Sequence, residues 1–186
     1  IQFCISEVDR LNHMVDQLLL LARFENQKQN VKQETIYLNA LVLDNLTRFS
    51  EKSESKKLKI KTQFSEDYYL ISDNYLVSII ISNLISNAIK YSNPNGEIAI
   101  ELEKTSDVVT FSITDYGVGI AKNDLDKIFN SFYRSDVSNH PEIKGTGLGL
   151  SIVKRLCDLL KLEIAVESKL NQGTKFVLNF PLAKLK

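Results

Sequence analysis

Polar side chains that could bind a metal or a phosphate gather in an otherwise apolar stretch near the middle of the chain. Asn83 and Asn87 are four residues apart, and Lys90 and Tyr91 follow one helical turn later, so in a helix all four line one stripe. A carboxamide oxygen is a hard ligand that suits Mg²⁺, and a lysine offers positive charge to phosphate. Because asparagine is a poor helix former, this spacing indicates a function, and solvent-facing asparagines remain the alternative.

A second motif, Asp115-Tyr116-Gly117-Val118-Gly119, follows a predicted strand in which Val109, Phe111 and Ile113 alternate. The same alternation points Asp115 inward at the end of that strand. A carboxylate there can accept a hydrogen bond from an exocyclic amine such as adenine N6, and the glycines leave room for a flat base beside the backbone. A tight turn uses the same residue types, so this motif alone is weak support for a binding site.

Three alternating glycines form a third motif, Lys144-Gly145-Thr146-Gly147-Leu148-Gly149, directly before an apolar helix. Backbone N–H groups at the start of a helix, with no Cβ atoms in the way, can cradle the phosphates of a nucleotide. The spacing matches neither a Walker loop nor a dinucleotide-binding fingerprint. A flexible hinge is the alternative.

A polar segment, residues 120–144, joins the second and third motifs. A cluster of apolar side chains followed by an arginine lies within it: Ile128, Phe129, Phe132, Tyr133 and Arg134. Aromatic side chains in a polar loop between two nucleotide-binding motifs favour a lid that folds over a ligand. A small packed surface helix is the alternative, and both descriptions can hold together.

Composition limits the class of protein. The 186 residues carry 23 Lys+Arg and 23 Asp+Glu, and this balance argues against nucleic acid as a partner, since phosphate neutralisation needs a basic surplus. The longest purely apolar run, from Leu18 to Ala22, is far shorter than the ~20 residues that cross a bilayer. Two cysteines and two histidines are too few for a disulfide framework or a multi-histidine metal site. A soluble cytosolic domain is therefore expected.

Residues 1–27 differ from the rest of the chain. Apolar residues recur there with heptad spacing and form a stripe wide enough for a helical bundle: Ile1, Cys4, Val8, Leu11, Val15, Leu18 and Ala22. Residues 28–33 are polar and have the composition of a linker. We therefore expect a separate element that forms a homodimer, and an amphipathic helix packed on its own domain is the alternative. Because no capping residue precedes Ile1, the helix is expected to begin upstream of this sequence.

Residues 34–186 alternate between strand and helix patterns. Strands are predicted near residues 35–38, 58–64, 68–71, 98–102, 109–115, 164–166 and 176–180, and helices over about 39–53, 73–91 and 149–161. Asn39 and Asp73 are the expected N-caps of the first two helices. Strands that are adjacent in sequence, with helices between them, predict an α+β fold. We expect a two-layer α/β sandwich in which helices cover one face of a mixed sheet.

Taken in order, these motifs resemble those of the ATP-binding catalytic domain of bacterial sensor histidine kinases. That family shares a superfamily with gyrase, heat-shock-chaperone and mismatch-repair ATPases. Four of its boxes have counterparts here in the same order: the asparagine box in residues 83–91, the first glycine box in 115–119, the phenylalanine box in 129–134 and the second glycine box in 145–149. Gly173-Thr174 resembles the closing Gly-Thr element. The likeness covers nearly all of residues 34–184.

The resemblance implies roles for individual residues. It implies that Asn87 ligates Mg²⁺, that Asp115 recognises adenine, and that the catalytic residues Lys90 and Arg134 lie near the phosphates. Contacts with ATP are implied for Asn83, Asn87, Lys90, Tyr91, Asp115, Gly117, Gly119, Ile120, Phe129, Phe132, Lys144, Gly145, Thr146, Gly147, Leu148, Gly149 and Thr174. Asn130 and Ser131 stand where many relatives have Glu-Pro, a departure in the lid that should leave nucleotide binding intact.

The same resemblance implies a reaction and its partners. Residues 1–27 are similar to the second helix of the dimerisation and phosphotransfer hairpin, but the box that holds the phosphoacceptor is missing, and His13 and His140 lack its context. ATP would therefore phosphorylate a histidine on an upstream helix, and the phosphate would pass to an aspartate of a response-regulator receiver domain. The chain is expected to be a cytoplasmic domain of a bacterial inner-membrane kinase, with any membrane attachment through upstream segments.

Two other functions remain open at this point. A serine kinase of the anti-sigma type would share the ATP-binding fold, but those small kinases lack the hairpin helix. A dimeric interaction module that only senses nucleotide would keep the same boxes without turnover.

Overall fold

The computed structural model describes residues 14–16, 18, 19, 22, 31–105, 107–135 and 145–182. The strands are β1 (Glu34–Tyr37), β2 (Lys59–Phe64), β3 (Tyr69–Ser72), β4 (Glu97–Thr105), β5 (Val108–Asp115), β6 (Glu163–Lys169) and β7 (Gly173–Pro181). The helices are α2 (Leu38–Arg48), α3 (Ser50–Ser55), α4 (Asn74–Tyr91), α5 (Gly149–Leu160) and a 3₁₀ turn, η1 (Lys122–Asp124).

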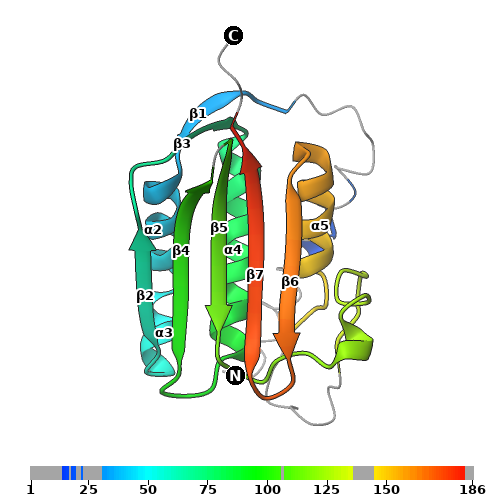
Figure 1. The fold of residues 1–186 in the computed structure, drawn as a ribbon. Helices are drawn as coiled ribbons and strands as arrows, with labels where there is room; N and C mark the ends of the chain where they lie inside the picture. Colours follow the sequence, from blue (N-terminus) through cyan, green and yellow to red (C-terminus); the bar gives the residue numbers. More distant parts are fainter. Residues whose placement is uncertain are drawn as a thin grey trace, which may run out of the picture.

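The main sheet has five strands in the order β2-β4-β5-β7-β6. β2 and β4 are parallel, and the other neighbouring pairs are antiparallel. Figure 1 shows α2, α4 and α5 together on one face of this sheet. The predicted two-layer α+β sandwich with a mixed sheet is therefore confirmed. The strands predicted near residues 35–38 and 68–71 do not join that sheet, because β1 and β3 pair with each other at one end of the molecule (Figure 1).

α4 is the central helix because one of its faces is almost entirely apolar. Its buried side chains are Leu76, Val77, Ile80, Ile81, Leu84, Ile85, Ala88 and Ile89. Burying a Leu or Ile side chain contributes roughly 1.5–3 kcal/mol, so this face anchors the helix firmly to the sheet. Asp73 caps the first turn by accepting a hydrogen bond from the Leu76 N–H at 3.1 Å, as predicted. The stripe that holds Asn83 and Asn87 lies beside the buried face and is half-buried.

The helix predicted over residues 39–53 differs from the structure in two ways. α2 begins one residue before Asn39, and the Asn39 side chain does not cap it. Instead, the buried Asn39 carboxamide donates to the Glu66 carbonyl and accepts from the Tyr68 N–H, both at 2.9 Å. The prediction of Asn39 as an N-cap is wrong because contacts distant in sequence use its hydrogen bonds. The helix also breaks at Phe49, so α3 is a separate short helix.

In the N-terminal region, the described residues 14–16, 18, 19 and 22 are helical. Met14 packs against the core, whereas Val15 and Leu18 of the heptad stripe are 52% and 41% exposed. The division into residues 1–27, 28–33 and 34–186 stays a prediction, and His13 and Cys4 lie outside the described residues. No helix in the described part of the chain combines the length and hydropathy that a bilayer crossing requires.

Candidate functional site

A cavity of about 440 Å³ lies at the end of the sheet where β5 ends and β7 begins, a size within the usual range for small-molecule sites. Helices α4 and α5, the loops that follow β5 and β6, and the lid segment contribute its walls. The lining residues are Asn87, Tyr91, Asp115, Val118, Gly119, Ile120, Ala121, Asp124, Ile128, Tyr133, Arg134, Ser135, Leu150, Leu170, Asn171, Thr174 and Phe176. Most of the predicted nucleotide motifs therefore meet at one cavity.

Asp115 is the buried acid of this cavity. Strand alternation turns it inward at the end of β5, where it is 4% exposed and lies opposite Thr174 of β7. One carboxylate oxygen accepts a hydrogen bond from the Gly117 N–H at 3.0 Å. Burial raises the pKa of Asp115 to about 6, and the backbone amides of Gly117 and Thr174 oppose that rise. At neutral pH the group is therefore mainly an ionised hydrogen-bond acceptor.

Thr174 is held beside Asp115 by a small hydroxyl network. Its Oγ1 lies 2.9 Å from the Ser168 Oγ, which in turn donates to the Gly173 carbonyl at 2.8 Å. The Ile120 N–H donates to the same serine hydroxyl at 2.8 Å. Strand β6, strand β7 and the loop after β5 are thus tied together at the cavity, and Ile120 and Thr174 both line it.

The polar stripe of α4 divides into two pairs. Asn87 and Tyr91 line the cavity. Asn83 and Lys90 instead face the glycine motif: a Cβ on Gly149 would lie 2.8 Å from Asn83 Oδ1, and a Cβ on Gly145 would lie 2.1 Å from Lys90 Nζ. The predicted single stripe therefore serves two neighbours, the cavity and the start of α5.

Lys90 carries a perturbed ammonium at the edge of the site. Burial is the main cause that lowers the pKa of Lys90 to about 8, and the positive charges of Arg134 and Lys56 contribute to the same shift. The Lys90 ammonium lies 4.8 Å from the centre of the Tyr91 ring, a cation–π distance. An anionic ligand near these cations would stabilise the charged form of Lys90.

Gly117 and Gly119 of the first glycine motif each lie close against the protein's own backbone. A Cβ on Gly117 would lie 1.9 Å from the Tyr91 carbonyl oxygen, and one on Gly119 would lie 2.1 Å from the Lys169 carbonyl oxygen. These glycines therefore permit a close approach to the protein's own backbone, and the approach of a base to them stays a prediction. Gly119 still lines the cavity, whereas Gly117 joins the end of β5 to the end of α4.

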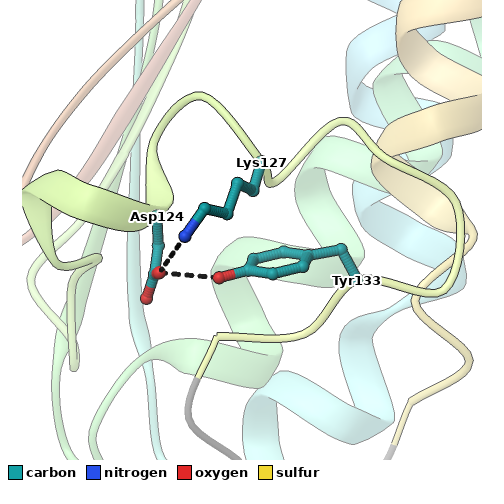
Figure 2. A network of polar contacts seen from close by, with 3 residues as sticks. All are labelled: Asp124, Lys127 and Tyr133. Carbon is teal, nitrogen blue, oxygen red and sulfur yellow. Dashed lines mark hydrogen bonds and ion pairs between the residues drawn. The ribbon is translucent and has the colours of Figure 1, made fainter.

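The lid segment, described here over residues 120–135, contains η1 and a series of turns. Figure 2 shows its polar network: the Tyr133 hydroxyl donates to Asp124 Oδ1 at 2.6 Å, and Lys127 Nζ lies 3.9 Å from the same oxygen. Ile128 is buried and anchors the segment to the core. The described part of this segment packs on the domain and forms a wall of the cavity, and its closure over a ligand stays a prediction.

The second glycine motif contacts the lid directly. Gly147 has a φ of +75°, and a Cβ there would lie 2.8 Å from the Phe132 carbonyl carbon. The Phe132 N–H donates to the Gly147 carbonyl at 2.9 Å, while the Phe132 ring is 61% exposed. Leu148 is fully buried, and its N–H donates to Thr146 Oγ1 at 3.3 Å. Lys144 and His140 lie outside the described residues.

Several lining residues were not among the predicted site residues. Asp124 comes from the lid segment, whereas Leu170 and Asn171 lie in the turn between β6 and β7 and Phe176 lies in β7, and the fold brings these two regions together. The turn at residues 171–173 was recognised as a turn, but no local pattern shows that it borders the same cavity as Asn87. Tyr133 was recognised as a lid aromatic without a role in binding, and its hydrogen bond to Asp124 is a tertiary feature.

The residues present suit a magnesium ion that is held mainly by phosphate and water. The described residues contain no cluster of three or more His, Cys, Asp or Glu side chains that could hold a metal by themselves. Asn87 lines the cavity, and within the described residues its carboxamide has no hydrogen-bond partner, so its oxygen is available as a ligand. Mg²⁺ commonly uses one or two protein oxygens together with substrate phosphates.

Comparisons with known proteins agree with this geometry. The family profile described as histidine kinase-, DNA gyrase B-, and HSP90-like ATPase matches residues 72–184. Sensor protein RprX of Bacteroides fragilis is 33% identical over 182 residues, which are 96% of this chain and 35% of that protein. The structure of the Acinetobacter baumannii histidine kinase AdeS matches with a TM-score of 0.82 at 26% identity, covering 98% of this chain and 84% of AdeS. Full-length ShkA in complex with AMPPNP matches with a TM-score of 0.83 at 25% identity, covering 96% of this chain and 37% of ShkA.

The chain therefore belongs to the histidine kinase-, DNA gyrase B- and HSP90-like ATPase family. Within this family, the chain contains an ATP-binding catalytic domain of the sensor histidine kinase type, like its relatives and structural neighbours. The resemblance seen in the sequence is therefore confirmed. It spans 35% to 52% of the length of the first curated relatives that it matches.

Proposed function

We propose that this chain binds MgATP in the cavity beside Asp115 and acts as the catalytic part of a sensor histidine kinase. The observation that carries the proposal is the presence of a buried carboxylate and an available carboxamide, Asp115 and Asn87, in the lining of one 440 Å³ cavity. The cations that a triphosphate needs lie at the edge of the same space, on α4 and in the lid segment.

The purine is proposed to bind at the inner end of the cavity. Asp115 accepts a hydrogen bond from the exocyclic amine, and the Thr174 hydroxyl contacts the ring beside it. Apolar lining from Ile120, Ile128 and Phe176 suits the faces of a flat base. The wider set of contacts implied by the family, which includes Asn83, Phe129, Thr146 and Lys144, belongs to this proposal.

The phosphates are proposed to extend from the purine toward Lys90 and Arg134. Asn87 contributes an oxygen ligand to Mg²⁺, and the glycine motif contributes backbone N–H groups at the start of α5. When bound, the metal would neutralise phosphate charge, and the residues of this chain would hold the triphosphate in line for transfer. Catalysis of this kind depends on positioning and electrostatic stabilisation, which suits a site with no nucleophile of its own.

The proposed acceptor is a histidine outside these 186 residues. The γ-phosphoryl group would pass to that histidine and then to an aspartate of a response-regulator receiver domain. Residues 1–27 would contribute to a homodimer through the heptad stripe, of which Val15 and Leu18 are exposed in the single chain. The domain would lie in the cytoplasm of a bacterial cell, with any membrane attachment through segments upstream.

Nucleotide titration tests the binding half of this proposal. We expect Asp115→Ala and Asn87→Ala each to weaken MgATP binding by about a hundredfold or more, measured by calorimetry, because each removes a directed contact in a desolvated site. The matched control is Asn74→Ala, which changes an exposed asparagine at the opposite end of the same helix. Affinities that stay at the wild-type value in both site variants would sink the assignment.

Radiolabelled ATP tests the transfer half. The chain alone should remain unlabelled, while a longer protein that includes the upstream helix should become labelled on a histidine of that helix. Label on His13 of the isolated chain would contradict the proposal that the acceptor lies elsewhere. A longer protein that binds MgATP but never becomes labelled would favour the alternative, a module that senses nucleotide without turnover.

A further inference from the structure

The last turn of α4 has an unusual set of hydrogen-bond partners. The final carbonyl groups of a helix have no partner within it and need donors from elsewhere. The Ala88 carbonyl accepts from the Ser92 N–H and hydroxyl, and the Tyr91 carbonyl accepts from the Val118 N–H at 3.2 Å. Two further carbonyls of this turn, those of Ile89 and Lys90, remain to be satisfied.

Lys56 supplies those bonds from the end of α3. Its ammonium donates to the carbonyls of Ile89 at 3.0 Å, Lys90 at 2.8 Å and Ser92 at 3.1 Å. These three acceptors match the three N–H donors of an ammonium group. A positive charge at a helix C-terminus is also favoured by the helix dipole, so Lys56 is an electrostatic cap as well as a donor.

The backbone of Lys56 is fastened to the same region. Its carbonyl accepts from the Asn95 N–H at 2.9 Å, in the turn that follows α4. Its side chain is only partly exposed and reaches across to α4 from a helix more than thirty residues earlier in the chain. Both the backbone carbonyl and the side-chain ammonium of Lys56 are therefore held in place relative to the end of α4.

The turn that Lys56 caps carries much of the proposed nucleotide site. Asn87 and Tyr91 line the cavity, and Lys90 lies against Gly145. We propose that Lys56, although it lies outside the cavity lining, is a positioning residue for nucleotide binding that fixes the last turn of α4 by capping its carbonyl groups. This inference rests on the proposed function, since it concerns the same site.

Lys56 has a second effect through its charge. Lys90 faces Arg134 of the lid segment and Lys56 of the α3 end, and the ring of Tyr91 lies beside it. Burial, together with these two neighbouring charges, lowers the pKa of Lys90 to about 8. A neutral residue at position 56 would therefore raise the pKa of Lys90, even as it weakens the cap.

The test compares nucleotide affinity in matched variants of the whole chain. Lys56→Met keeps the length of the side chain and removes its donors and charge, Lys56→Gln retains an uncharged donor, and Lys56→Arg retains charge and donors. The control is Lys52→Met, one turn earlier on α3, where the lysine is exposed. We expect MgATP affinity at pH 7 to fall about tenfold in Lys56→Met, less in Lys56→Gln, and to be largely restored in Lys56→Arg.

The pH profile separates positioning from a general loss of structure. In the wild type, affinity for MgATP should fall above about pH 8 as Lys90 loses its proton. In Lys56→Met and Lys56→Gln this fall should begin at a higher pH, whereas in Lys56→Arg and Lys52→Met it should stay at the wild-type pH. Amide hydrogen exchange without nucleotide should accelerate at Ser92 and Val118 in Lys56→Met and stay unchanged at Ile152 in α5.

The outcomes distinguish this inference from the proposed function. If the wild type binds no MgATP, the proposed function fails. If the wild type binds but Lys56→Met and Lys56→Gln bind equally well with the same pH profile, only the role of Lys56 is refuted. An equal loss in Lys52→Met would likewise refute it. If Lys56→Met does not fold, the comparison of Lys56→Gln with Lys56→Arg decides the question by the same criteria.

Discussion

The two sides of the cavity are built differently. One side, which we call the scaffold wall, comes from regular elements: Asn87 and Tyr91 on α4, Asp115 on β5 and Thr174 on β7. The other side, which we call the loop wall, consists of the described residues 118–135, where only a short 3₁₀ turn is regular. Asp115 and Thr174 are almost fully buried, whereas Ser135 on the loop wall is exposed.

This difference separates two kinds of contribution to binding. Residues of the scaffold wall take part in the hydrogen bonds and packing that hold the domain together, so changing them should alter both the stability of the fold and the affinity for nucleotide. The loop wall is fixed by isolated backbone and side-chain hydrogen bonds and by the buried Ile128. Changes there should alter affinity with little effect on the free energy of unfolding.

Gly117→Ala should give the largest effect, because Gly117 lies where the end of β5 packs against the end of α4 in the scaffold wall. The added Cβ would lie 1.9 Å from the Tyr91 carbonyl oxygen and 2.8 Å from the Ser92 Cα, and backbone atoms cannot move aside cheaply. We expect the free energy of unfolding to fall by about 4 kcal/mol or more. Urea denaturation followed by circular dichroism measures this loss.

Gly145→Ala is the matched control for Gly117→Ala. Among the described residues, its Cβ would meet the end of the Lys90 side chain, at 2.1 Å, and a lysine can adopt another rotamer. We expect a loss of stability below about 1 kcal/mol together with a clear loss of MgATP affinity, because Lys90 moves. Equal losses of stability in the two variants would remove the distinction between a scaffold contact and a site contact.

Asp115→Asn should show that the buried, ionised Asp115 of the scaffold wall lowers the stability of the fold. The pKa of Asp115 rises from 3.8 to about 6 on folding because the carboxyl group is buried, so the folded state holds more protons than the unfolded state between these values. The contribution of Asp115 to the stability of the wild type therefore falls as the pH rises through this window, by roughly 3 kcal/mol in total at about 1.36 kcal/mol per pKa unit. Asparagine does not ionise, so the variant lacks this fall.

The measurement is the difference in free energy of unfolding between Asp115→Asn and the wild type at a series of pH values. Between about pH 4 and pH 7.5 this difference should move in favour of the variant, while MgATP affinity at pH 7.5 is lost. Any constant effect of the lost acceptor cancels in the pH dependence. A difference that is flat across this range would show that Asp115 is not a buried ionised group in the free protein.

The scaffold wall could be predicted from the sequence because local rules determine it. The apolar period of α4, its Asp73 cap and the alternation along β5 together placed Asn87 and Asp115 correctly on their elements. The spacing of the glycines gave the positions of the two glycine motifs, although the room beside Gly117 proved to be occupied by the protein's own backbone.

The loop wall and the support behind α4 could not be predicted in the same way. The bond between Asp124 and Tyr133 joins residues across an irregular segment, and no periodicity marks it. Lys56 reaches α4 from a different helix, and a lysine in a polar stretch resembles any surface lysine. Asn39 was wrongly predicted as an N-cap for the same reason. Its hydrogen-bond partners at residues 66–68 are distant in sequence, and its side chain bonds to them and not to the start of α2.

Tyr133→Phe should give a smaller effect that falls on affinity alone. The change removes the hydroxyl that donates to Asp124 Oδ1 at 2.6 Å, while the ring and its place in the cavity remain. We expect MgATP affinity to fall about fivefold, since the loop wall loses the bond that orients Tyr133 and Arg134, and the urea midpoint to stay at the wild-type value. A shift of the urea midpoint as large as that of Gly117→Ala would mean that the loop wall is part of the scaffold.

Lys127→Met should give the smallest effect and tests whether the charge or the hydroxyl holds the loop wall together. Lys127 Nζ lies 3.9 Å from the Asp124 oxygen that Tyr133 binds, and its side chain is 53% exposed, so water screens the pair (Figure 2). An exposed ion pair of this length contributes less than about 0.5 kcal/mol. Methionine keeps the apolar part of the side chain over the Tyr133 ring, where the ammonium lies 6.0 Å from the ring centre. We therefore expect MgATP affinity to change by less than twofold in calorimetry at both low and high salt.

The contradicting outcome is a loss of MgATP affinity in Lys127→Met as large as that in Tyr133→Phe, with high salt restoring the affinity of neither variant. Asp124 would then depend on Lys127 for its orientation, and the Tyr133 hydroxyl alone would not hold the loop wall.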